Sequence, residues 1–419
     1  MESVLNNPEI ANMRNQNHLK TLDNIETPYF LIDEKELMSN VVNLQSALNT
    51  YWNNALVAYS FKANALPWLV TYFKDMGFYA EVVSDDEYQL ALMLGYEKTK
   101  IIYNGPCKSK ESFIDAMNNG CIVNIDSQTE LLWLNDLDCS SNKKYEVGIR
   151  VNFDLEMLCP GESSMGTAGS RFGFCYENGE LKKAIDSLRR LNHVNLVGLH
   201  LHCSSKSRSV NIYRAISKIA CEIKESYALE LKYVDIGGGF YGGMIDKPQF
   251  TDYLEVISSE LKKAFDKDNV VLIVEPGASL VSSPFSYVTK VIDVKQTTAN
   301  NFVVTDGSRI HIDPLMHKTE YFFNVIYNQE NRVGIIEKQV VSGFTCIEFD
   351  RLFVLEKYPK LSIEDMIIYQ KVGAYTLCLS PLFIKNYPSV YVKQKDTYAL
   401  VRKKGTVEDY LNINNAFNS

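Results

Sequence analysis

Short apolar runs that end in polar or glycine residues recur through the first two thirds of the chain. Stretches between them have helical spacing or helix-forming composition, for example 84–96, 127–137 and 252–265, and each opens with a Ser, Asp or Thr suited to capping. Strands that alternate with helices over about 220 residues predict a (β/α)₈ barrel, whose parallel strands are buried on both faces. The same pattern leaves an open doubly wound sheet as the alternative. The eight runs are 55–62, 79–84, 100–105, 121–126, 145–152, 196–203, 233–239 and 271–277.

After Pro284 the pattern changes to β-branched and aromatic runs with little room for helices, which predicts a second, mainly antiparallel β-domain. Near the N-terminus the run PYFLID predicts one short strand that could pair with this domain, and a helix follows it. We therefore expect the barrel to span 34–280 and the β-domain to combine 1–33 with 281–419.

Composition places the chain among globular enzymes, since 46% of its 419 residues are hydrophobic and 22% are charged. No run approaches the length of a membrane span and the first residues hold no apolar signal core, so we expect a cytoplasmic protein that does not insert into membranes. The nine cysteines lack a CxxC pair, which indicates reduced thiols. A net charge of −8 with dispersed cations argues against a nucleic-acid partner.

The carboxyl ends of barrel strands form the site in this architecture, so chemistry-bearing residues there are the candidates. A lysine, Lys62, ends the first apolar run, and three glycines after the seventh run suit an anion such as phosphate. Pyridoxal phosphate needs both a lysine amine and a phosphate site, and a carboxylate such as Glu275 could pair with its pyridine nitrogen. A buried ion pair and a simple tight turn are the alternatives for these features. The strand-end candidates are Lys62, Glu81, Arg150, His200, His202, Gly237, Gly238, Gly239 and Glu275.

Seven motifs carry a resemblance to a known family. In order and at similar spacing, SFKAN, AEVVSDDE, GLHLHCSS, VDIGGGF, EPG, SGFTCIEFD and GAYT resemble the fold-type III PLP-dependent decarboxylases, which include diaminopimelate and ornithine decarboxylases. The resemblance runs from about Thr27 to about Ser380. It implies an alanine racemase-like barrel, pyridoxal 5'-phosphate as cofactor, a small amino-acid substrate and no metal in the site.

The resemblance also implies a role for each matching residue. Lys62 resembles the Schiff-base lysine, His202 the residue that stacks on the ring, and Glu275 the pyridinium partner. Cys346 resembles a thiol that reprotonates Cα and is contributed by the partner chain, so a homodimer with shared sites is implied. The other matches are a phosphate cradle of Ser205, Gly237, Gly238, Gly239 and Gly277, a phosphate contact at Tyr375, and the supporting residues Glu81, Glu87 and Arg150.

The positions where this chain departs from the family motifs are expected to change which substrate binds more than which reaction takes place. The arginine that usually follows EPG is Ala278 here, so we expect backbone groups and Ser205, rather than charge, to hold the phosphate. Where diaminopimelate decarboxylases place Arg-Pro and then a tyrosine, this chain has Asp313-Pro and His317. A carboxylate at that position would repel the distal carboxylate of diaminopimelate, unless Arg309 points inward and compensates.

In place of the family's CESGD motif this chain has CIEFD, which retains Cys346 and Asp350. The residues on either side of Glu348 make this wall of the expected substrate pocket more apolar. We therefore expect a decarboxylase for a non-standard amino acid or an amino-acyl conjugate in a biosynthetic pathway, and meso-diaminopimelate as a poor substrate. Delivery of the substrate by a carrier protein stays open. The alternatives are a diaminopimelate, ornithine or lysine decarboxylase proper, an amino-acid racemase on the same barrel, a zinc-dependent barrel hydrolase that uses HLH, and a non-catalytic PLP-binding regulator.

Overall fold

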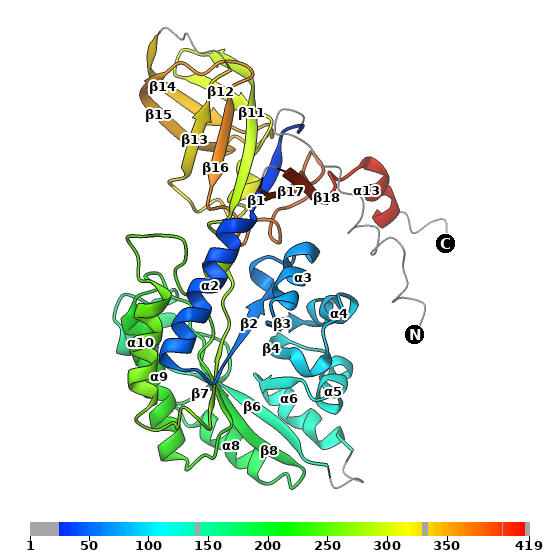
Figure 1. Ribbon diagram of the computed structural model, residues 1–419, viewed down its shortest axis with the longest axis vertical. Coiled ribbons are helices and arrows are strands. Elements are labelled where there is room, and N and C mark those ends of the chain that lie inside the picture. The colour runs from blue at the N-terminus through cyan, green and yellow to red at the C-terminus, as the bar shows by residue number, and fades with distance from the viewer. Residues whose placement is uncertain (1–24, 139–142, 329–333, 396, 415–419) are drawn as a thin grey trace. The chain divides into compact units, whose positions relative to one another are not determined.

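The computed structural model describes residues 25–138, 143–328, 334–395 and 397–414 (Figure 1). The chain divides into two compact units, one made of residues 40–280 and the other of residues 1–39 with 281–419. In the part of the chain described, no helix is long and apolar enough to cross a bilayer.

Residues 40–280 form a closed barrel of eight parallel strands, as the alternating pattern predicted. Neighbouring strands pair in the order β2-β3-β4-β5-β6-β8-β9-β10, and the β10–β2 pairing closes the ring. Each of the eight predicted runs overlaps a barrel strand. The barrel strands are β2 (Ala55–Ser60), β3 (Tyr79–Ser84), β4 (Ile101–Cys107), β5 (Ile122–Ile125), β6 (Tyr145–Asn152), β8 (Val194–His200), β9 (Tyr233–Asp235) and β10 (Val271–Val274), and the two-residue β7 (Phe174–Cys175) pairs with β6 outside the ring.

Helices alternate with these strands along the chain. Ser84 caps α4 by accepting a hydrogen bond from Glu87 N, and Ser127 caps α6 in the same way. The predicted helix 252–265 begins earlier, at Phe250, because Asp252 accepts a hydrogen bond from the backbone of Gln249 (2.7 Å) and so fixes the first turn there. The helices are α2 (Glu34–Tyr51), α3 (Pro67–Asp75), α4 (Asp85–Met93), α5 (Lys110–Asn118), α6 (Gln128–Trp133), α7 (Leu155–Leu158), α8 (Glu180–Arg189), α9 (Val210–Ser226), α10 (Phe250–Leu261) and α11 (Ala278–Val281).

A mixed, mainly antiparallel sheet builds the other unit (Figure 1). The N-terminal strand β1 (Tyr29–Asp33) lies within it, antiparallel to β11 and parallel to β17, so the predicted pairing with the C-terminal strands is present. Tyr29, Val288, Tyr391 and Tyr398 meet in its core. The remaining strands are β11 (Phe285–Gln296), β12 (Asn301–Thr305), β13 (Phe322–Ile326), β14 (Ile335–Ser342), β15 (Arg351–Pro359), β16 (Met366–Gln370), β17 (Ser389–Gln394) and β18 (Thr397–Arg402).

The sequence analysis missed four elements of this unit. Strands β13 and β15 were not predicted, and the expectation of little helix was wrong at α12 (Arg309–Ile312) and α13 (Val407–Asn414). Every second residue of β13 is exposed, including Phe322 and Ile326, so its apolar sequence does not show which face is buried. The short helix α12 depends on a cap, since the Ser308 side chain accepts a hydrogen bond from Ile310 N.

Candidate active site

Lys62 lies one turn beyond its strand and not on the strand itself. Strand β2 ends at Ser60, and Phe61–Ala63 form a single 3₁₀ turn in which Phe61 and Ala63 are buried. The Lys62 side chain is 36% exposed, and its amine donates to the carboxylate of Glu81 on β3, which is 1% exposed. Ser60 Oγ donates to the same carboxylate oxygen at 2.5 Å. A buried carboxylate therefore holds the lysine at the mouth of the barrel.

Glu275 follows β10 and lies beside two other buried ionisable groups. One ligand atom each of Glu275, His200 and Asp235 lies within 4.8 Å of the others, and His200 Nε2 is 3.5 Å from Glu275 Oε2. Burial opposes ionisation of Glu275, but its interactions with His200, with Lys62 and with Asp235 hold its pKa well below the usual value. Burial and the Glu275 charge raise the pKa of Asp235 far above its usual value. Glu275 is therefore the ionised member of this carboxyl pair and Asp235 the protonated one.

The three glycines after β9 form a close-fitting turn between neighbouring segments. Gly237 has φ +68°, its N–H donates to Asp235 Oδ1 (2.8 Å), and a Cβ there would lie 2.5 Å from His202 Nδ1. A Cβ on Gly238 would lie 2.0 Å from the carbonyl oxygen of Glu275. Within the described residues, the N–H groups of Gly238 and Gly239 donate to no protein acceptor. This backbone suits an anion that needs N–H donors at close range.

We expect Gly238→Ala to destabilise the barrel by about 2–3 kcal/mol, since the added methyl meets backbone that cannot rotate away. Chemical denaturation of the cofactor-free protein would measure this. The control is Gly161→Ala, where φ is also unfavourable (+81°) but a Cβ meets nothing within 4 Å, so about 1 kcal/mol is expected. Equal losses in the two variants would contradict the assignment of close contact at Gly238.

His202 and Arg150 lie in the same barrel. Burial, and then the charges of Lys62 and Arg150, lower the pKa of His202 to about 3, so its imidazole is neutral near pH 7. Arg150 Nη1 donates to Asp126 Oδ2 at 2.9 Å, and its guanidinium lies 4.7 Å from the ring centre of Phe172. These contacts fix the arginine against the barrel wall.

Three further predicted cofactor residues have defined local contacts. Glu87 accepts a hydrogen bond from Val83 N (2.8 Å), and burial raises its pKa to about 7. Ser205 Oγ accepts from Arg208 N at 3.2 Å. A Cβ on Gly277 would lie 2.7 Å from Ala63 Cβ, so this glycine lets the segment after β10 approach the lysine turn. Ala278, at the predicted departure from the family, begins α11 and is buried.

The arrangement fits pyridoxal phosphate. Three buried polar atoms around the barrel mouth have no hydrogen-bond partner among the described residues: Arg150 Nε, His200 Nδ1 and His202 Nδ1. Such groups are costly to bury unless a ligand or water satisfies some of them. The same barrel offers a lysine for the aldehyde, N–H groups for the phosphate and an ionised carboxylate for the ring nitrogen. The bound cofactor would serve as an electron sink for the bond that breaks at Cα.

The β-domain holds the predicted thiol in a loop that Asp350 organises. Cys346 is exposed, and Asp350 is 3% exposed. Asp350 Oδ2 accepts hydrogen bonds from Ser308 Oγ (2.9 Å) and from both the backbone and the hydroxyl of Thr345 (3.1 and 2.6 Å). Glu348 is exposed and pairs with Arg351 at 3.3 Å, and Tyr375 is 42% exposed with φ +57°. Asp350 thus shapes the loop, while Cys346, Glu348 and Tyr375 are accessible.

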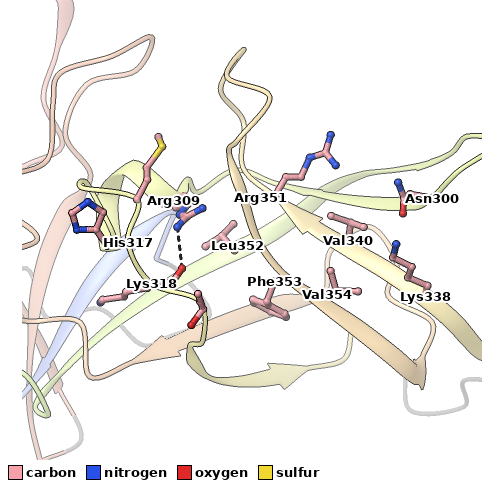
Figure 2. Close-up of a pocket in the computed structure, with 12 residues that line it drawn as sticks. Asn300, Arg309, His317, Lys318, Lys338, Val340, Arg351, Leu352, Phe353 and Val354 are labelled. Atoms are coloured by element: carbon pink, nitrogen blue, oxygen red, sulfur yellow. Dashed lines mark hydrogen bonds between the residues drawn. The ribbon is translucent and has the colours of Figure 1, made fainter. Parts of the chain in front are cut away.

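Asp313 binds its own loop and the nearest arginine. The Asp313 side chain is buried, and its oxygens accept from Arg309 Nε (2.9 Å), from the backbone of His317 and Lys318 (3.0 Å each) and from Tyr321 OH (3.1 Å). Arg309 Nη2 also donates to the carbonyl of Lys318 (2.9 Å), the dashed line in Figure 2. Arg309 therefore neutralises Asp313, and neither charge is available in full to a substrate.

Basic side chains line a pocket of the β-domain with a volume of about 430 Å³. Figure 2 shows the predicted residues Arg309 and His317 on one side of it and Arg351 and Lys338 on the other. Val340, Leu352, Phe353 and Val354 supply an apolar floor. The pocket suits a ligand that combines an anionic group with an apolar stem.

The sequence analysis did not single out the polar residues inside the barrel. Asn104 Nδ2 donates to both Glu275 Oε1 (2.5 Å) and Glu81 Oε1 (3.2 Å), and Asp235 lies beside Glu275. Each of these residues falls within an apolar run, in IIYNG for Asn104 and YVDIGGG for Asp235. A polar residue in an otherwise apolar barrel strand was the signal that could have identified them, since an unpaired polar side chain is costly there.

Fold and site together define an enzyme that uses pyridoxal phosphate on a β/α-barrel. The model of the family "Pyridoxal-dependent decarboxylase, pyridoxal binding domain" matches residues 35–282. The chain belongs to this family, and the protein is a PLP-dependent amino-acid decarboxylase, a carboxy-lyase. This membership confirms the resemblance and sets aside the racemase, zinc hydrolase and non-catalytic alternatives.

Curated relatives and solved structures support the same family assignment. The chain is 27% identical to diaminopimelate decarboxylase of Methanocaldococcus jannaschii over 402 residues, which cover 92% of this chain and 90% of that protein. It is 26% identical to the L-glutamyl-[BtrI acyl-carrier protein] decarboxylase of Niallia circulans, with 92% of each chain covered. A crystal structure of the M. jannaschii enzyme superposes with a TM-score of 0.81 at 25% identity and covers 93% of this chain and 92% of that one.

Proposed function

We propose that this decarboxylase acts on an amino acid whose distal end is joined to a larger group, and not on free meso-diaminopimelate. The contact between Arg309 and Asp313 carries this proposal. A distal carboxylate needs a cation to bind it, and the arginine nearest the family's substrate position already neutralises Asp313. A conjugated substrate has no distal charge to pair, so the arrangement does not penalise it.

The basic pocket supports a substrate with an anionic linker. Lys338 and Arg351 favour a phosphodiester or similar anion, and the apolar residues of the pocket favour an aliphatic stem. The Niallia circulans relative carries in its name a glutamyl group on an acyl-carrier protein. An aminoacyl group on a phosphopantetheine arm is therefore the substrate class that we infer.

In the proposed mechanism, Lys62 would hold the cofactor through its amine, and Glu275 would keep the ring nitrogen protonated, so that the bound group could supply an electron sink. The N–H groups of Gly238 and Gly239 would hold its phosphate, and the neutral His202 would pack against its ring. The cysteine Cys346, supplied by the partner of a homodimer, delivers a proton to Cα after carbon dioxide leaves. The exposure of Cys346 and of Phe349 (75%) is consistent with a loop that a second copy covers. Sedimentation should therefore give the mass of two chains, and a monomer would contradict the shared site.

A direct comparison of substrates tests the proposal. Carbon dioxide release would be measured with L-glutamate joined through its side-chain carboxyl to phosphopantetheine, and with meso-diaminopimelate, L-ornithine, L-lysine and free L-glutamate. We expect kcat/KM for the conjugate to exceed that for each free amino acid by about a hundredfold or more, the range that a mismatched charge in a specific site produces. A Lys62→Ala preparation serves as the blank.

The outcome tests the proposed substrate class separately from the decarboxylase chemistry. Rapid turnover of meso-diaminopimelate would refute the substrate class while leaving the decarboxylase chemistry in place. Release from the conjugate at rates no better than from free glutamate would also refute it, since the linker would then contribute no binding energy to catalysis.

A further inference from the structure

Asn104 occupies an unusual position in the barrel, since its single amide nitrogen serves two carboxylates. Nδ2 lies 2.5 Å from Glu275 Oε1 and 3.2 Å from Glu81 Oε1. Asn104 is 1% exposed, and both carboxylates are nearly inaccessible to water. Two like charges this close in a buried site repel each other unless donors compensate them. The amide supplies one proton to each.

The orientation of the Asn104 amide is fixed by its neighbours. Ionised carboxylates only accept hydrogen bonds, so the NH₂ group must face them and Oδ1 must face Asn124. Asn124 Nδ2 donates to that oxygen at 2.8 Å, and Tyr233 OH in turn donates to Asn124 Oδ1 at 2.8 Å. The hydrogen bonds thus run in one direction, from the tyrosine through two amides to the two carboxylates.

The backbone makes room for this chain of hydrogen bonds. A Cβ on Gly148 of β6 would lie 1.9 Å from Asn124 Oδ1 and 2.1 Å from Tyr233 OH, and a Cβ on Gly198 of β8 would lie 2.0 Å from the Tyr233 ring. Glycine inside a strand weakens it, so glycines at these two places mark a site where side chains need the space. The barrel is shaped around the network.

We propose that Asn104 is a positioning residue for the cofactor, which ties the carboxylate beside Lys62 to the carboxylate that faces the pyridine nitrogen. The inference rests on the proposed roles of Lys62 and Glu275. Lys62 contacts Glu81, and Glu275 is the proposed ring partner, so Asn104 links the two ends of the reacting system. The shared donor keeps the two carboxylates fixed relative to each other, and acid should release the cofactor when Glu275 takes up a proton.

Other titratable groups face the same pair and set the acid sensitivity together with Asn104. Glu87 and Lys62 interact electrostatically with Glu81, and four other groups interact with Glu275. Asn104 Nδ2 donates directly to both carboxylates, so the amide ties the two ends together. The groups at the Glu275 end are His200, His202, Asp235 and Tyr233.

The test is an acid titration of the cofactor-loaded protein. Absorbance of bound pyridoxal phosphate and its release into a dialysate would be followed from pH 8 downward in the wild type and in Asn104→Leu. We expect the midpoint of acid release to move up by about one to two pH units in the variant, since hydrogen bonds to a charged group are lost.

Asn40→Leu is the matched control, because Asn40 is also buried in the barrel unit but its amide donates to the backbone carbonyl of Leu280. Its midpoint should stay within about 0.5 unit of the wild type, as expected for a residue without a direct bond to either charge. Asn104→Asp keeps the side-chain shape, removes a donor and should move the midpoint in the same direction, so it replaces Asn104→Leu if that variant fails to fold.

Each outcome decides one claim. An unchanged midpoint in Asn104→Leu, or equal shifts in the two leucine variants, would overturn the role of Asn104 and leave the proposed function intact. A wild type without cofactor absorbance that depends on Lys62 would instead refute the proposed site, and the inference with it.

Discussion

Lys62→Ala should abolish the covalent attachment of pyridoxal phosphate and lower kcat for decarboxylation by about a thousandfold or more. The amine of Lys62 is held at the barrel mouth by the buried Glu81 carboxylate, and in the proposed mechanism it is the group that binds the aldehyde. Alanine removes both the nucleophile and the partner of Glu81. Absorbance spectra before and after borohydride, followed by peptide mapping, would show whether the reduced cofactor sits on residue 62.

Lys98→Ala is a suitable control for this variant. The Lys98 side chain is 33% exposed, close to the 36% of Lys62, and it pairs with Asp115 at 2.8 Å on the outside of the barrel. We expect it to keep the cofactor spectrum and activity, since exposed pairs of this kind contribute about 1 kcal/mol or less to stability. Cofactor trapped on another lysine would show that the assignment of Lys62 is wrong.

Glu275→Gln should lower kcat by about a hundredfold to a thousandfold while the protein still binds pyridoxal phosphate. Burial disfavours the charge of Glu275, but His200 and Lys62 keep its pKa well below the usual value, so the carboxylate can hold a proton on the ring nitrogen. Glutamine has the same shape without the charge. The ring then loses its positive nitrogen and accepts the electron pair from Cα less well.

Steady-state kinetics and cofactor affinity, measured on the same preparations, would separate the two effects. Glu260→Gln is the control, because Glu260 is also buried but lies on α10 and pairs with Lys263 outside the barrel interior. A Glu275→Gln enzyme with unchanged kcat would exclude the carboxylate as the pyridinium partner. A loss confined to cofactor affinity would assign it to binding alone.

The barrel could be predicted from sequence because each of its strands leaves a local signature. Runs such as ALVAYS and YAEVVS contain no exposed residue, so they read as largely apolar stretches, and Ser84 and Ser127 mark helix starts in the sequence itself. The β-domain was less predictable. Strand β13 has exposed apolar residues, and α12 has only four residues, so neither shows a period that a pattern can reveal.

The residues of the candidate site also differ in whether the sequence could reveal them. Residues at strand ends, such as Lys62 and Glu275, could be proposed because a charge after an apolar run is visible in the sequence. Asn104 and Asp235 lie within such runs, and their importance comes from partners distant along the chain. For Asp313, which the sequence places near the substrate, only the structure shows the hydrogen bonds that it accepts from Arg309 and Tyr321.

The sequence by itself determined the alternating barrel, the family resemblance and the cofactor, because these depend on local periodicity and on motifs with fixed spacing. The tertiary structure decided which charges neutralise each other: Glu81 with Lys62, Arg309 with Asp313, and Glu275 as the ionised neighbour of a protonated Asp235. The physical reason is that electrostatic and hydrogen-bond energies depend on distance and burial in space, which separation along the chain does not specify.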